Sequence, residues 1–306
     1  MILSRISVFH TACFAAVFFF PNKGFCLKTL TAYHPPSHLV IEEIYDIEVG
    51  PASTGIAVKL GSGGKLFIAV DSPPQLISLD AELKFISTQE LKNLGVGSVS
   101  DFCITGSFTL IIIDPMVSLL FRTDTRLRQL NSLQLETDRI IFQPISVTSS
   151  PEGELYIANY SDHEIWKMDR NGTLSRHSKM NGTIRLNNKK IEYIPAMKYI
   201  SFIDNGHIKF LNSYGNIVRS RTVETFIKNP ADFVIINSEI WIGGESLECV
   251  SATSSKVLYS FPKDSLYAIG ISPISAIAAA GDSLLYMLSY RGDKLAKAVI
   301  IRENSE

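Results

Sequence analysis

Short apolar strands separated by polar turns recur along most of the chain, and the clearest example spans residues 144–175. Within it, Leu155-Tyr156-Ile157-Ala158 is a continuous apolar run that follows the Pro151-Glu152-Gly153 turn. Glu164 to Met168 then alternates polar and apolar residues before the Asn171-Gly172 turn. Runs of β-branched and aromatic residues bounded by Pro, Gly, Asn and Asp predict strand, turn and strand.

This unit recurs about every 40 residues, a period typical of propeller blades with four strands each. The second strand of each unit is predicted at 66–70, 109–113, 155–158, 199–203, 239–242 and 277–280. The third is predicted at 75–79, 118–122, 164–168, 207–211, 246–250 and 283–288. The first, inner strand is predicted at 55–58, 101–104, 145–148, 191–194, 232–236 and 268–271. The pattern therefore predicts an all-β fold, a single six-bladed β-propeller with mostly four-stranded blades.

One alternating segment, Leu39 to Val49, is left over before the first unit. A propeller must join its ends or leave open edges that pair with other chains, so we expect this strand to pair with the last blade. Residues 294–301 also fit an outer strand there, which would give the closing blade five strands. The propeller would then span residues 39–301, after a linker at 27–38 and before a tail at 302–306. Helix should be nearly absent, because no later stretch shows a capped 3.6-residue stripe.

The N-terminus has a different composition from the rest of the chain. An apolar segment at 11–20 lies between Arg5 and Lys23, and no acidic residue precedes Glu42. This segment is too short to span a bilayer comfortably. Its pattern is that of a secretory signal peptide. We therefore predict removal of residues 1–26, export to the periplasm or the cell exterior, and no stable membrane span in the mature chain; an uncleaved anchor is the alternative.

The unit at 144–175 also resembles a known repeat. The residues that carry the resemblance are Pro144, Pro151-Glu152-Gly153, Leu155-Tyr156-Ile157-Ala158 and the segment from Ile165 to Asn171-Gly172. They are similar to an NHL repeat, and the whole chain resembles six-bladed β-propellers of the NHL and TolB-like kind. This resemblance implies a fold that hosts binding proteins, scaffolds, lactonases and lyases, so function does not follow from it.

Charge and motif content exclude several functions. The formal net charge of −1 offers no basic field, so a nucleic-acid partner is not expected. No nucleophile motif, phosphate-cradling loop or pair of histidines at metal spacing occurs after the N-terminal segment. Cys103 and Cys249 lie in apolar runs of the second and fifth units, so we expect two buried, unpaired thiols.

Two sets of acidic residues are candidate site residues. Six acids in the turns after the second strands would form a ring on one face of the propeller, a candidate binding face for a cation or a cationic ligand. They are Asp71, Asp114, Asp162, Asp204, Glu245 and Asp282. Ordinary turn chemistry is the preferred alternative, because aspartate bonds its own backbone and these positions lie too far apart for one ion.

Asp101 and Asp232 form the second set. They begin the first strands of the second and fifth units, nearest the axis, and could face each other across the channel. The resemblance to metal-dependent lactonases implies a cation at this place, although the Glu-Gly-Pro segment common in those enzymes is not matched at Val49-Gly50-Pro51. An acid at strand entry is the alternative interpretation.

The leading hypothesis is a non-catalytic binding or scaffold propeller that holds a protein, a peptide or a glycan through its loop face. We expect it to be monomeric and to need no cofactor. The competing hypothesis is a metal-dependent, lactonase-like hydrolase or a lyase, with a divalent cation at the channel mouth.

Overall fold

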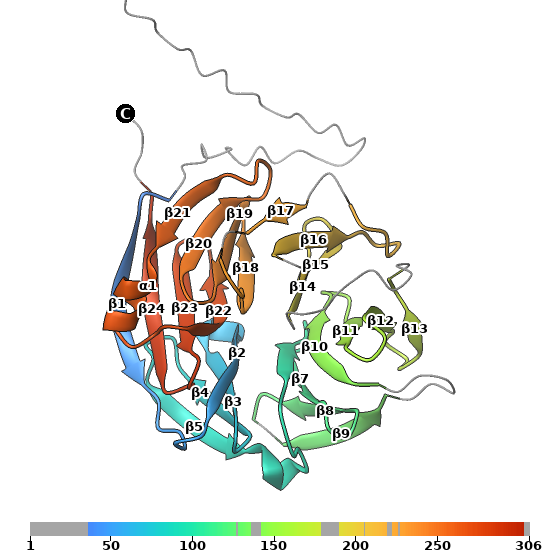
Figure 1. Cartoon of the computed structure of the whole chain (residues 1–306). Helices are drawn as coiled ribbons and strands as arrows, with labels where there is room; N and C mark the ends of the chain where they lie inside the picture. Colours follow the sequence, from blue (N-terminus) through green and yellow to red (C-terminus); the bar gives the residue numbers. More distant parts are fainter. Residues whose placement is uncertain are drawn as a thin grey trace, which may run out of the picture. The chain divides into compact units, whose positions relative to one another are not determined.

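The computed structural model describes residues 36–126, 128–135, 142–178, 190–204, 206–218, 222–225 and 227–302. The predicted signal segment lies outside the described residues. Residues from His34 onward form one compact unit. In this unit the described strands form six four-stranded antiparallel sheets, arranged as blades around a central axis (Figure 1). The predicted six-bladed propeller is thereby confirmed.

Within each of the first five blades, consecutive strands run from the axis to the rim as an antiparallel meander. From the axis outward, blade 1 contains β2 (Thr54–Leu60), β3 (Leu66–Asp71), β4 (Gln75–Leu79) and β5 (Phe85–Glu90). Blade 2 contains β6 (Asp101–Ile104), β7 (Thr109–Asp114), β8 (Leu119–Asp124) and β9 (Gln129–Gln134). Blade 3 contains β10 (Pro144–Ser149), β11 (Leu155–Asn159), β12 (Glu164–Met168) and β13 (Leu174–Arg176). Blade 4 contains β14 (Ile191–Ile194), β15 (Tyr199–Asp204), β16 (His207–Leu211) and β17 (Val223–Glu224). Blade 5 contains β18 (Asp232–Ile236), β19 (Glu239–Gly243), β20 (Leu247–Ser251) and β21 (Val257–Phe261).

The last blade joins the two ends of the described chain. From the axis outward it contains β22 (Ile274–Ala280), β23 (Leu284–Ser289), β24 (Lys294–Ile301) and β1 (His38–Asp46). Strand β1 pairs antiparallel with β24, with Val40 opposite Val299 and Tyr45 opposite Leu295. The leftover N-terminal strand therefore closes the ring as predicted, but the blade has four strands where five were considered.

In this blade the predicted strands were displaced by one whole strand. No strand lies at 268–271, where the short helix α1 (Lys263–Ala268) and a turn lead into β22. The segments predicted as second and third strands belong to the first and second strands, β22 and β23. Ile269 and Ile271 pack in the core between the last two blades without belonging to a strand, and their apolar side chains led to the wrong assignment of an inner strand.

The core consists of apolar layers between neighbouring blades. Phe67 in blade 1 packs with Phe102 in blade 2, and Trp241 in blade 5 packs with Ile277 in blade 6. Because the second strands are covered on both faces, they read as continuous apolar runs, and every residue of β7 is buried. In the described part of the chain, no helix is long and apolar enough to cross a membrane.

Candidate functional site

The propeller unit has two faces, which differ in the turns they carry. We call the entry face the side on which the chain enters β2, β6, β10, β14, β18 and β22, the six inner strands. Because the strands are antiparallel, the turns between second and third strands lie on the same side. The exit face carries the turns that follow the inner strands.

The six turn acids do not form a ring on one face. Five of them follow second strands and lie on the entry face, whereas Asp282 lies in the turn between β22 and β23, on the exit face. This difference follows directly from the misplaced inner strand of the last blade. In that blade the entry-face turn after β23 carries Asp293 instead, which accepts a hydrogen bond from Ser289 Oγ at 2.8 Å.

The five entry-face acids are bonded to neighbouring groups of the protein. Their partners are Val99 N for Asp71 (3.1 Å), Gly97 N for Asp114 (2.7 Å), the Trp166 indole for Asp162 (2.9 Å), Lys209 for Asp204 and Lys263 for Glu245 (2.8 Å). These bonds tie each turn to its own or the next blade, as turn aspartates commonly do. Their geometry supports the turn-chemistry interpretation.

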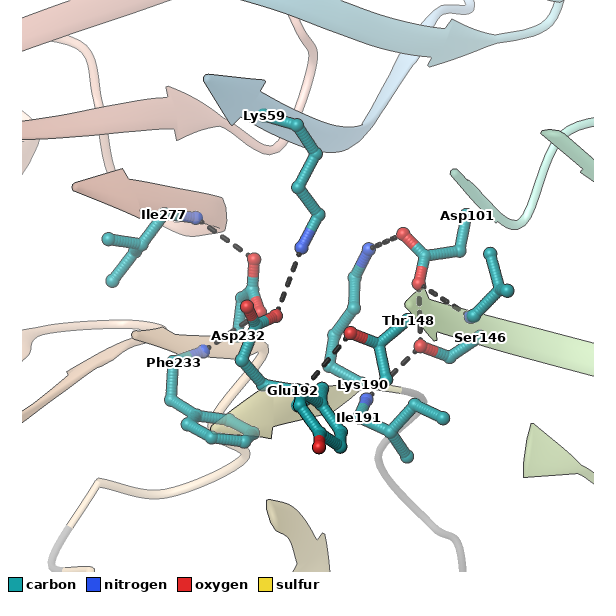
Figure 2. Close-up of polar contacts among 12 residues, drawn as sticks. Lys59, Asp101, Ser146, Thr148, Lys190, Ile191, Glu192, Asp232, Phe233 and Ile277 are labelled. Carbon is teal, nitrogen blue, oxygen red and sulfur yellow. Dashed lines mark hydrogen bonds and ion pairs between the residues drawn. The ribbon is translucent and has the colours of Figure 1, made fainter. Parts of the chain in front are cut away.

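The two inner-strand acids lie at the axis, at the starts of β6 and β18 (Figure 2). Asp101 is fully buried; it accepts hydrogen bonds from Ser146 Oγ at 2.5 Å and Val147 N at 3.1 Å. Asp232 is 3% exposed and accepts from two backbone amides, Phe233 N at 2.9 Å and Ile277 N at 3.0 Å. The inner strands thus bring both carboxylates to the centre, each held by groups from a neighbouring blade.

Two lysines and a glutamate complete this cluster. Lys190, which immediately precedes β14, forms an ion pair with Asp101 at 2.7 Å. Lys59 of β2 forms one with Glu192 of β14 at 3.3 Å. In Figure 2 both ammonium groups point in between the carboxylates. We call these five side chains the axial ion network: Lys59, Asp101, Lys190, Glu192 and Asp232.

Sequence reasoning had found only two members of the axial ion network. A signal for the others exists, because Lys59 interrupts the apolar inner strand β2, and Lys190 and Glu192 flank Ile191 at the start of β14. A charged residue in a strand expected to be covered on all sides needs a buried partner. What the sequence lacks is the identity of that partner, since it comes from another blade.

In the axial ion network, burial and the neighbouring charges shift the pKa values of the side chains in opposite directions. Burial alone would lower the pKa of Lys59, but the carboxylates of Glu192, Asp101 and Asp232 outweigh it and hold the pKa above its usual range. Burial raises the pKa of Asp232, against the opposite effect of Lys190 and Lys59. The lysines are therefore the counter-ions of this cluster.

The residues present do not fit the divalent cation that the resemblance implied. Among the described residues, no group of three or more His, Cys, Asp and Glu side chains could hold a metal ion. Asp101 is already bonded to an ammonium, a hydroxyl and an amide. Calcium takes six to eight oxygen ligands. A cation at this position would therefore have to displace Lys190.

Two cavities flank the axial ion network. The entry cavity, of about 380 Å³, is lined by Ser98, Ser100, Pro115, Lys190 and Tyr290 among others. The exit cavity, of about 310 Å³, is lined by residues of all six inner strands and includes Lys59 and Glu192. The exit cavity shares lining residues with a wider mouth of about 390 Å³, formed by turns of blades 1 to 4. Asp101 and Asp232 line none of these spaces.

The two described cysteines lie in different blades. Cys103 in β6 and Cys249 in β20 are both buried, and both thiols are free. Burial raises the pKa of each thiol, with Asp101 adding to the effect at Cys103 and Glu239 at Cys249. These thiols are poor nucleophiles, because the thiolate is the reactive form.

Comparisons with known proteins place the fold. No family model matches the chain, and no curated protein matches it. The structure is similar to virginiamycin B lyase from Staphylococcus aureus, solved as a catalytically inactive variant with quinupristin. The TM-score is 0.63 at 12% sequence identity, and the match covers 86% of this chain and 100% of that one. A streptogramin B lyase gives 0.60 at 13% identity, covering 85% and 97%. A chain of a nidogen–laminin complex gives 0.58 at 14%, covering 70% and 82%. At these identities the likeness shows the fold alone.

Proposed function

We propose that the chain is an exported, non-catalytic binding or scaffold propeller that engages a protein, a peptide or a glycan through its loops. The observation that carries this proposal is the axial ion network. The two acids best placed for chemistry, Asp101 and Asp232, are bonded within the protein and line neither axial cavity. A general acid or base must come within hydrogen-bond reach of its substrate, and neither carboxylate lines an axial cavity that a substrate could enter.

The entry face offers contact surface for a partner. Large apolar or aromatic side chains are exposed in its turns and connections, with Met116 at 79%, Tyr267 at 74% and Tyr290 at 55%. Methionine and aromatic residues are enriched where proteins bind one another. The similarity to a propeller chain from a nidogen–laminin complex agrees with a binding role.

The competing function is a hydrolase or lyase with a cation at the channel mouth. One observation favours it: Asp101 and Asp232 meet in one network at the axis (Figure 2). The similarity to lyases shows only that the fold can support such chemistry.

Thermal melting with and without metal separates the two functions. A ligand that binds only the folded state stabilises it by about 2.7 kcal/mol at a hundredfold excess over Kd. That would raise the melting temperature of a domain of this size by several degrees. We expect millimolar calcium, zinc or EDTA to leave the melting temperature unchanged.

A calcium-induced rise that disappears in Asp101→Asn and in Asp232→Asn would contradict the binding-module proposal. Asp282→Asn is the matched control, because it removes one exposed acid that lines neither axial cavity nor the mouth. With that outcome, hydrolysis of lactones would be the next activity to assay.

A further inference from the structure

The exit cavity ends on a charged floor and has largely apolar walls. Its floor is the ion pair between Lys59 and Glu192, and its walls include Val58, Phe233 and Ala279. The side chains of Lys59 and Glu192 are 20% and 34% exposed, so the pair can be reached from the cavity. A deep apolar space with a few polar groups at one end is the usual form of a ligand site.

Glu192 can accept another partner. In the described part of the chain, Lys59 is the one side chain bonded to its carboxylate, and it uses Oε2 alone. An ionised carboxylate has about four acceptor positions on its two oxygens. The second oxygen, Oε1, is thus the acceptor that the floor offers to a ligand.

The axial ion network contains three carboxylates and two ammonium groups. Its formal charge is −1 when Asp232 is ionised and zero when Asp232 holds its proton, so the network carries no excess of positive charge that would repel a cation. In the ionised state one more cation would balance the uncompensated charge, which is costly in a protein interior. Lys190 lines the entry cavity, so the acidic member open to a ligand is Glu192, on the exit side.

The mouth of the exit cavity has the opposite character. Its lining has no charged side chain and includes Ser62, Thr105, Phe108, Pro151 and Pro195. This surface fits a neutral peptide backbone and does not fit a second charge. A ligand for the whole space therefore has a cationic tip, an apolar stem and a neutral body.

We propose that the exit cavity binds the side chain of a lysine presented by a peptide or protein ligand. The ammonium donates to Glu192 Oε1, the methylenes lie between the apolar walls, and the backbone of the ligand rests at the mouth. This assignment rests on the proposed binding function and adds a ligand class and a site on the exit face, opposite the contact surface of the entry face.

Calorimetric titration of the full chain tests this assignment. The probe is Nα-acetyl-lysine N-methylamide, with the norleucine analogue as the same stem without the ammonium and 1,5-diaminopentane as a stem with a charge at both ends. We expect the lysine probe to bind at least about tenfold more tightly than the norleucine analogue, the ratio expected from one hydrogen bond to a charged group. The diamine keeps that hydrogen bond but places a second charge at the uncharged mouth, so we expect it to bind more weakly than the lysine probe. Equal binding of norleucine, or equal or tighter binding of the diamine, overturns the assignment.

Variants locate the site. Glu192→Gln should weaken the lysine probe by about tenfold or more. Glu152→Gln is the matched control: it removes an exposed acid from the same face, does not line the exit cavity or its mouth, and should leave binding unchanged. Ala279→Leu narrows the cavity without removing a charge and should weaken the lysine probe at least as much as Glu192→Gln does, so the assignment does not depend on Glu192→Gln folding. Unchanged binding in Ala279→Leu contradicts it.

The titrations, taken together with the thermal melting in calcium and in EDTA, separate this inference from the proposed function. If the lysine probe does not bind and calcium has no effect on melting, the exit-cavity assignment fails and the binding function stands. Calcium stabilisation that depends on Asp101 would refute the proposed function itself.

Discussion

Lys190 and Asp101 show how much stability depends on single residues at the axis. The two side chains are 7% and 1% exposed and lie 2.7 Å apart. Lys190→Met leaves a buried carboxylate without its counter-ion, so we expect a loss of about 3–5 kcal/mol in the free energy of unfolding, measured with urea.

Two further variants complete this test. The double variant Lys190→Met/Asp101→Asn should lose less than the sum of the single variants, because the residues are in contact. Lys167→Met breaks the half-exposed pair with Glu154 and should cost less than about 1 kcal/mol. Equal losses for Lys190→Met and Lys167→Met would show that the axial pair is not a stabilising one.

Asp232 should make stability depend on pH. Burial raises its pKa above the ordinary value of 3.8. At a pH between the ordinary pKa of the unfolded chain and the raised pKa of the folded protein, the folded state binds a proton that the unfolded state has lost. The free energy of unfolding therefore falls as pH rises through this window, by about 1.4 kcal/mol for each pH unit.

Urea unfolding between pH 4 and 7 measures this effect. Asp232 is surrounded by four other charged residues, Lys59, Lys190, Asp101 and Glu192. Because these four contribute to the pH dependence of stability in both proteins, wild type is compared with Asp232→Asn. The variant should become more stable relative to wild type as pH rises. A difference that stays constant with pH would mean that Asp232 is ionised throughout.

At this scale the sequence predicts positions better than partners. Asp101 and Asp232 were identified because strand entry points can be recognised from apolar runs. Lys59, Lys190 and Glu192 were missed because their partners lie up to 133 residues away and meet them only when the ring closes. The pattern of apolar and polar residues within one strand does not show which residue of another blade will be its partner.

Among the elements, the residue after β24 ties the closing blade to its neighbour. Arg302 donates to Glu239, at the start of β19, at 2.7 Å, and the Glu239 side chain is fully buried. Arg302→Met removes this cation, and we expect it to destabilise the protein by about 3 kcal/mol in urea unfolding.

Arg128→Met is the matched control for this prediction. Arg128 pairs with Asp124 at 2.6 Å, but its side chain is 70% exposed. Exposed pairs contribute roughly 0–1 kcal/mol, so the control should be nearly neutral. If both variants unfold alike, Arg302 does not hold blades 5 and 6 together.

Strand boundaries followed the apolar pattern where turns are marked by Gly, Pro, Asn or Asp. The inner strands at 101–104, 191–194 and 232–236 have the predicted bounds. The pattern failed in the last blade, where Ile269 and Ile271 are apolar because they pack in the core beside β22 without belonging to a strand. One misplaced strand then moved Asp282 to the wrong face.

For the propeller as a whole, the repeat period was the informative feature. Six units of about 40 residues, none of which can bury both faces alone, require a closed ring. Function has no comparable signal, because it depends on which side chains six strands bring to one axis.

Export is a prediction about the whole molecule. The acid-free, apolar N-terminus predicts cleavage, so N-terminal sequencing of protein from the native source should begin near Leu27. Mature protein that still begins at Met1 in the cytosol would contradict this prediction. A membrane-bound form beginning at Met1 would support the uncleaved anchor.

The pairing of β1 with β24 sets an order for folding during synthesis. Asp46 and Lys294, which form an ion pair between these strands, are 248 residues apart. At about 5–20 residues per second, the ribosome needs roughly 12–50 s to make the intervening chain. During that interval β1 has no partner, so the ring cannot close until translation is almost complete.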